Sequence, residues 1–195
     1  MPLTRVIVAG LWAAFIISWL VLAQFNKKAS RNAPWRTAWG LRLVVIAGVS
    51  VIVWLHRHGV APGFITFISR PLLLHPYAIA QWIGVGLCLV GFGSAFWARW
   101  HLGRNWGMPM SLRQGHELVT SGPYSYVRHP IYTGLMLAMI GSAITLGLLW
   151  LALLAVYFVF FLICARTEEK MMVSQFPDTY PAYRRRTKML IPFVF

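Results

Sequence analysis

Residues 131–165 read IYTGLMLAMIGSAITLGLLWLALLAVYFVFFLICA, a run of 35 residues without a charge. As a single helix this run would be about 52 Å long at ~1.5 Å per residue, whereas the hydrocarbon core of a bilayer is only ~30 Å thick. One span cannot hold it. The run therefore predicts a helical hairpin that crosses the membrane twice and turns near residues 145–147.

Three more apolar runs precede this hairpin, at residues 6–25, 38–55 and 78–98. Each is long enough to cross a bilayer as a helix. The first run lacks the small-residue cleavage site of a signal peptide, so we expect it to be a retained helix. The runs predict an all-α integral membrane protein with about five transmembrane helices, the last two of which form the hairpin.

The chain divides into two regions on this pattern. Residues 1–98 hold about three spans, and residues 99–195 hold the hairpin together with the polar segments on either side of it. Prolines and a glycine interrupt residues 59–77, which we expect to be either interfacial or partly inserted. In the third span, glycines at Gly84, Gly86, Gly91 and Gly93 are expected to permit close helix contacts.

The composition is typical of a membrane protein and argues against several other classes. Hydrophobic residues make up 58% of the 195 residues and charged residues 11%, against about 25% charged in a soluble domain. The net charge is +14, but the basic residues flank the apolar runs, which favours membrane orientation over nucleic-acid binding. No βαβ pattern for a Rossmann-type cofactor site is present, and the six histidines show no metal-binding spacing. The ten tryptophans are interpreted as lipid-facing or interfacial filler.

The basic residues also predict how the chain is oriented. If residues 26–36, 99–130 and 166–195 face one compartment, that side holds 14 Lys and Arg residues, against 3 on the other side. The positive-inside rule then makes this side cytoplasmic. All four acidic residues lie there too, so the central polar stretch and the tail could build one site.

The central polar stretch, residues 100–134, reads WHLGRNWGMPMSLRQGHELVTSGPYSYVRHPIYTG. Its glycines and prolines bend the backbone, and its polar side chains at the bends are suited to binding a ligand. Arg128 and His129 precede Pro130 at the expected start of a helix, where anions are attracted. Ordinary turn chemistry, with Arg, His and Tyr as interface anchors, is the alternative.

Two carboxylates follow the last apolar run. Glu168 and Glu169 lie at a bilayer boundary, where an acidic residue is costly unless it is solvated, paired or bound to a cation. They therefore indicate either a solvated helix end or a site for cationic groups.

The order of these residues resembles the isoprenylcysteine carboxyl methyltransferase family. In the central stretch the pattern consists of Leu102, Gly103, Asn105, Trp106, Gly115, His116, Leu118, Val119, Gly122, Tyr124, Arg128, His129, Pro130 and Tyr132. The tail adds Glu168, Glu169, Phe176, Asp178, Tyr180, Tyr183 and Pro192. The resemblance covers about residues 100–195; Pro177 and Pro181 depart from the family pattern.

The resemblance implies an integral membrane enzyme that uses S-adenosylmethionine, bound in a cytosolic pocket built from residues 100–134 and the tail. Implied cofactor contacts are His116, Leu118, Val119, Gly122, Tyr124, His129, Pro130, Tyr132 and Glu168. The acceptor would be a lipophilic or lipidated molecule that enters from the bilayer. No metal and no nucleic acid is implied.

The charges of the donor agree with these residues. S-adenosylmethionine carries a sulfonium, an ammonium and a carboxylate, which Glu168 and the residues near the helix start at Arg128 and His129 could meet. For a carboxylate acceptor no general base is needed, and Arg128, with Arg166 or Asn105, would orient the oxygen. For an amine acceptor a base must remove a proton, and Glu169 or Tyr124 is the candidate.

Several alternatives stay open at this point. O-methylation of an isoprenylcysteine-type carboxylate is preferred, and N-methylation of a phospholipid amine is the second choice. A membrane reductase that shares the C-terminal pattern and a non-enzymatic membrane protein are further alternatives. The short chain with five predicted spans favours a prokaryotic protein of the bacterial cytoplasmic membrane with its active site facing the cytoplasm.

Overall fold

The computed structural model describes residues 2–25, 78–107 and 117–192, together with positions 50, 54, 58, 59, 63, 115 and 194. The regular secondary structure of these residues is helical, with α-helices α1 (Leu3–Leu22), α4 (Ala78–Leu102), α5 (Pro130–Thr145), α6 (Leu149–Gln175) and the short α7 (Tyr180–Arg186). The described residues contain no strand, only one isolated parallel bridge between Val127 and Lys188. The predicted all-α class is confirmed.

Three described helices are long and apolar enough to cross a membrane. They are α1 with the turn that follows it (Leu3–Phe25), α4 with its following turn (Ala78–Asn105), and α6. α5 is apolar but has only 16 residues. These four helices correspond to the first, third, fourth and fifth predicted spans; the predicted span at residues 38–55 and the segment 59–77 fall mainly outside the described residues.

The predicted hairpin is present. α5 ends at Thr145 and α6 begins at Leu149, so the chain turns within three residues, with Gly147 at a φ of 142°. α6 then continues through Gln175, ten residues beyond the uncharged run. Residues 166–175 contain neither glycine nor proline, and the first helix breaker is Pro177, so nothing in the sequence ends the helix at the membrane boundary. Glu168 and Glu169 consequently lie within the helix.

Paired glycines bring α4 and α5 into backbone contact. A Cβ atom on Gly91 would lie 2.5 Å from the carbonyl oxygen of Gly134, and one on Gly84 would lie 2.7 Å from that of Gly141. Gly84 and Gly91 are seven residues apart in α4, as Gly134 and Gly141 are in α5. Seven residues are about two helical turns, so the two glycines of each helix lie on one face, and these faces meet in the antiparallel pair. Gly86 and Gly93 have nothing within 4 Å of such an atom. Only two of the four glycines therefore serve the predicted close contact.

Aromatic packing attaches α1 to this pair. Phe15 stacks on Phe92 of α4 with ring centroids 4.8 Å apart, and Thr4 Oγ1 donates to Gln81 Oε1 at 2.6 Å. At the other end of α1, Arg99 Nη2 donates to the Leu22 carbonyl at 3.0 Å. A guanidinium at the C-terminal end of a helix is favourable because the last carbonyls carry partial negative charge.

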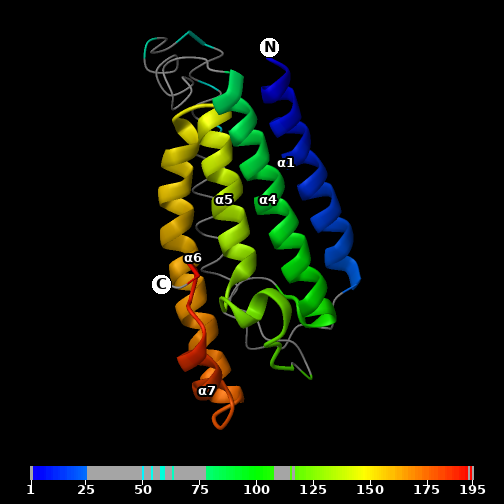
Figure 1. The fold of residues 1–195 in the computed structure, drawn as a ribbon, viewed down its shortest axis with the longest axis vertical. Helices are drawn as coiled ribbons and strands as arrows, with labels where there is room; N and C mark the ends of the chain where they lie inside the picture. Colours follow the sequence, from blue (N-terminus) through cyan, green and yellow to red (C-terminus); the bar gives the residue numbers. More distant parts are fainter. Residues whose placement is uncertain are drawn as a thin grey trace.

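The helices place the polar segments at one end of the molecule. In Figure 1, α7 and the described residues between α4 and α5 lie at the lower end, and the N-terminus lies at the upper end. The tail and the central polar stretch therefore meet, as the charge pattern predicts.

Candidate active site

A cavity of about 710 Å³ lies at the end of the bundle where these polar segments meet. α1, the end of α4, α5, α6, α7 and residues 118–132 all contribute to its wall. Most lining side chains are aromatic or aliphatic, including the tryptophans Trp12, Trp19, Trp106 and Trp150. The interpretation of tryptophan as lipid-facing or interfacial filler does not hold for these four, whereas Trp82, Trp97 and Trp100 are about half exposed or more.

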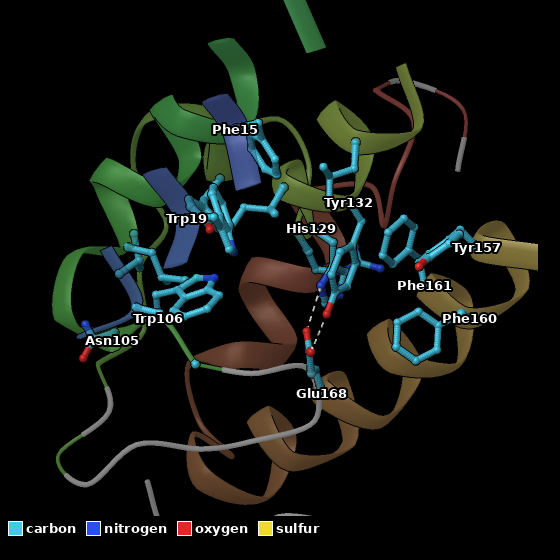
Figure 2. Close-up of a pocket in the computed structure, with 18 of the residues that line it drawn as sticks. Phe15, Trp19, Asn105, Trp106, His129, Tyr132, Tyr157, Phe160, Phe161 and Glu168 are labelled. Atoms are coloured by element: carbon cyan, nitrogen blue, oxygen red, sulfur yellow. Dashed lines mark hydrogen bonds and ion pairs between the residues drawn. The ribbon is translucent and has the colours of Figure 1, made fainter. Parts of the chain in front are cut away.

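The polar part of the cavity is built around Glu168. Tyr132 donates its hydroxyl proton to Glu168 Oε1 at 2.6 Å, and His129 Nδ1 lies 3.3 Å from Glu168 Oε2 (Figure 2). The rings of His129 and Tyr132 are parallel within 7°, and Tyr132 in turn stacks on Phe161 at 4.6 Å. In Figure 2 this group lies between Trp19 on one side and Phe161 on the other. The carboxylate is thus held in a fixed position beside aromatic faces.

The side chain of His129 is 10% exposed, and both of its ring nitrogens face carboxylates. Nε2 lies 3.7 Å from Glu169 Oε1 and is a buried nitrogen without a hydrogen-bond partner among the described residues. Burial by itself lowers the pKa of the imidazole, but the hydrogen bonds and charges of Glu168 and Glu169 outweigh burial and raise it above the usual 6.5. The two carboxylates therefore stabilise the cationic form of the ring.

Glu169 does not line the cavity, and it belongs to a second group that includes Arg128 of the cavity wall. Its carboxylate accepts a hydrogen bond from Arg128 Nε at 2.6 Å and lies 3.4 Å from Arg184 Nε, and its side chain is only 5% exposed. Arg128 Nη1 also donates to the backbone carbonyls of Arg184 and Thr187. The Arg128–Glu169 pair therefore ties α6 to the tail behind the site.

Backbone bonds continue this attachment. The amides of Arg128 and His129 donate to the carbonyls of Lys188 and Met189 at 2.8 and 3.1 Å. Tyr183 donates its hydroxyl proton to the Tyr124 carbonyl at 2.7 Å. The tail thereby places tyrosines in the cavity wall, and burial raises the pKa of Tyr183 to about 12 and that of Tyr124 still further. Both phenols are protonated at neutral pH.

The structure brings most of the predicted site residues to one cavity. Those that line it are Asn105, Leu118, Val119, Tyr124, Arg128, His129, Tyr132 and Glu168. Those that do not are Gly122, Pro130, Arg166 and Glu169. His116 lies outside the described residues.

The predicted residues outside the wall have other surroundings. Gly122 has a φ of 60°, and a Cβ there would lie 2.3 Å from the His101 ring, so this glycine shapes the loop. Pro130 is the first residue of α5, where its missing N–H costs little. Arg166 is exposed on α6. Among the described residues no cluster of three or more His, Cys, Asp or Glu side chains could hold a metal ion.

The contribution of α1 was missed by the sequence reasoning. Trp12, Phe15 and Trp19 all line the cavity, and their spacing of three and four residues puts them on one helix face. This spacing was visible in the sequence, but an aromatic face in a membrane helix is equally typical of lipid contact.

Comparison with known proteins defines the class. The family model described as phospholipid methyltransferase matches residues 79–179, more than half of the chain. The chain therefore belongs to the phospholipid methyltransferase family. This membership confirms the predicted class of membrane methyltransferases and the resemblance to the isoprenylcysteine type.

Of three similar proteins, two carry methyltransferase names and the third is named as a metal-resistance protein. The cobalt-zinc-cadmium resistance protein CzcN of Cupriavidus metallidurans is 36% identical over 141 residues, which cover 70% of this chain and 64% of that protein. The protein-S-isoprenylcysteine O-methyltransferase of Schizosaccharomyces pombe is 41% identical over 81 residues, 40% of this chain and 34% of the relative. Methanethiol S-methyltransferase 2 of Bradyrhizobium diazoefficiens is 33% identical over 129 residues, 60% of this chain and 48% of the relative. The chain thus spans less than two thirds of the length of each of these relatives.

Proposed function

We propose that this protein transfers a methyl group from S-adenosylmethionine to a lipophilic acceptor at the membrane. The observation that carries the proposal is the single cavity in which Glu168, His129 and Tyr132 form a polar end and aromatic side chains form most of the remaining wall. A charged donor and an apolar acceptor need these two environments side by side.

The residues present fit S-adenosylmethionine. A cavity of about 710 Å³ is within the range of ~300–1,000 Å³ of small-molecule sites. Glu168 offers a carboxylate to the ammonium or sulfonium, and His129, whose cationic form the neighbouring carboxylates stabilise, lines the cavity and attracts the carboxylate of the methionine part. The faces of Trp19 and Trp106 are suited to cationic or aromatic groups.

When bound, S-adenosylmethionine supplies a methyl group on a positively charged sulfur, which becomes a neutral thioether after transfer. Tyr132 and His129 hold Glu168 in place, so no reorganisation of this carboxylate is needed during the reaction. The aromatic wall excludes water, and positioning of the two reactants accounts for most of the rate enhancement over the uncatalysed reaction.

For the acceptor, we propose a carboxylate carried on an apolar tail. Such an acceptor needs no general base, and Arg128, whose described hydrogen bonds use Nε and Nη1, would orient its oxygen through Nη2. The name of the Schizosaccharomyces pombe relative supports O-methylation. N-methylation is less well supported, because Glu169 is paired away from the cavity and Tyr124 stays protonated at neutral pH.

The names of other relatives favour a second candidate, S-methylation of a thiol. A thiolate, like a carboxylate, is an anion that the cations at Arg128 and His129 would attract. Assays with a carboxylate and a thiol acceptor of equal apolar size separate the two candidates.

The first experiment is calorimetric titration of S-adenosylhomocysteine into the purified protein in lipid nanodiscs. We expect saturable binding, and we expect Glu168→Gln to weaken it roughly tenfold or more, because a charge-assisted contact is lost. Asp178→Asn, which removes an exposed carboxylate from the tail, is the matched control and should leave the affinity unchanged. No binding by the folded wild-type protein would reject the proposal.

A further inference from the structure

Two stacked tryptophans lie in the wall at the apolar end of the cavity. Trp12 of α1 and Trp150 of α6 have ring centroids 5.0 Å apart and ring planes at 28°. Trp12 Nε1 also donates a hydrogen bond of 2.9 Å to Ser142 Oγ of α5, and Ser142 is fully buried. The pair therefore joins three helices at one level of the bundle.

The lining of the cavity ends at this level on each of the three helices. Trp12 is the first lining residue of α1, Met139 the last of α5 and Trp150 the first of α6. Given the directions of these helices, each is the lining residue of its helix farthest from the polar end. Along α5, Tyr132 lies at the polar end and Ser142 at the level of the tryptophan pair. The two residues are ten positions apart, which is about 15 Å along the helix.

We propose that the Trp12 and Trp150 pair sets the maximum length of the apolar tail that an acceptor can carry. This inference rests on the proposed function, because the reactive head of the acceptor must meet the polar end. A tail that extends away from Tyr132 and Glu168 runs between aromatic walls until it reaches the two indoles. A longer tail must separate the stack or leave the cavity.

The pair is suited to act as a fixed stop. Trp12 is held by its hydrogen bond to Ser142 and packs edge-on against Phe92 at 4.9 Å, so rotation of its ring would break both contacts. Ser142 Oγ in turn donates to the Ala138 carbonyl at 2.8 Å, which fixes the acceptor of that bond. Trp12 cannot move aside without breaking these contacts, and Trp150 stacks on it, so displacing the pair has a cost that a few additional methylene groups must offset.

The test uses N-acetyl-S-alkyl-cysteines of increasing linear chain length, without cofactor. Native mass spectrometry of the full-length protein measures the bound fraction for each chain length. For the wild-type protein we expect binding to fall sharply beyond a threshold length. Trp150→Ala should move this threshold to longer chains, changing the ratio of long-chain to short-chain binding by roughly tenfold or more.

A second variant is expected to act in the opposite direction. Leu153 lies one turn closer to the polar end on α6 and also lines the cavity, so Leu153→Trp should move the threshold to shorter chains. Trp82→Ala removes a half-exposed tryptophan of α4 that does not line the cavity, and it should leave the threshold unchanged. If Trp150→Ala does not fold, Leu153→Trp decides alone.

The inference is overturned if no chain length binds, if binding shows no threshold, or if the threshold is the same in the wild-type protein and in the folded variants. Titration of S-adenosylhomocysteine into the same samples tests the proposed function separately. A protein that binds this compound but shows an unmoved threshold would keep the methyltransferase assignment and lose the tryptophan stop.

Discussion

Glu168 and Glu169 are neighbours in α6 with different surroundings. Successive residues of a helix point about 100° apart, so the two carboxylates point in different directions, and each faces a different ring nitrogen of His129. Glu168 lines the cavity with Tyr132, whereas Glu169 is only 4% exposed and lies among Arg128, His129 and Arg184. The first carboxylate lies in the wall of the cavity, and the second holds the tail in place.

This difference predicts unequal losses of folding stability from two equivalent substitutions. Glu169→Gln leaves the buried guanidinium of Arg128 without its counter-charge, and breaking a buried ion pair in this way costs about 3–5 kcal/mol. Glu168→Gln should cost much less stability, since its side chain is partly exposed. Reversible unfolding in mixed micelles measures both free energies. Equal losses for the two variants would show that Glu169 has no special structural role.

His129 predicts a pH dependence of stability. Its pKa in the folded state is raised above 6.5 by Glu168 and Glu169, which lie 3.3 and 3.7 Å from its ring nitrogens. The protonated form therefore stabilises the fold fully below pH 6.5, and this contribution is lost as the pH rises through the folded-state value. We expect the thermal midpoint to fall over this range in the wild-type protein and to fall less in His129→Gln. Parallel pH profiles for the two proteins would contradict this assignment.

At the scale of whole helices, the contact between α4 and α5 depends on two glycine pairs. The carbonyl oxygens of Gly134 and Gly141 occupy the space where side chains on Gly91 and Gly84 would lie. Small residues are the usual means by which membrane helices approach closely, because the hydrophobic effect does not drive their association within lipid. The same two pairs also determine the register of the helices.

Alanine substitutions at glycines of α4 test this contact. Gly91→Ala places a Cβ 2.5 Å from a backbone oxygen, so the helices must separate, and we expect a loss of about 1–3 kcal/mol. Gly86→Ala meets no atom within 4 Å and should be neutral or stabilising by up to ~1 kcal/mol, because alanine favours the helix. The changes in unfolding free energy relative to the wild-type protein should therefore differ in sign or clearly in size between the two variants. A loss at Gly86 as large as that at Gly91 would reject the glycine-pair contact.

The helical elements could be predicted well because a bilayer restricts them to a narrow range of lengths. The uncharged run 131–165 indicated both the hairpin and its turn, and polar residues at span ends indicated where a cavity would form. The rotation of each helix could not be predicted. Whether Trp12 faces lipid or a cavity, and which of two adjacent glutamates faces a ligand, depends on packing partners that lie far away in the sequence.

For the whole molecule, the charge pattern predicts that the tail and the polar end of the cavity face the cytoplasm. Arg185→Cys, at an exposed tail position, should react with a membrane-impermeant maleimide in inside-out vesicles and not in intact cells. Leu3→Cys, at the opposite end of the bundle, should show the reverse pattern. The two native cysteines are buried, so background labelling should be low. Labelling of Arg185→Cys from outside the cell would invert the topology.

The glycine pairs have a consequence for how such a protein can diverge. The glycine pairs specify the contact between α4 and α5 within the helices themselves, so this contact does not depend on the connection between them. Asn105, just after α4, and Tyr132, near the start of α5, therefore keep their relative positions when that connection changes. The connection between the two helices can therefore change during evolution without altering how α4 and α5 pack, as long as the residues that line the cavity are kept. Related proteins can then differ in their acceptor through changes in this connection while they keep the same framework of helices.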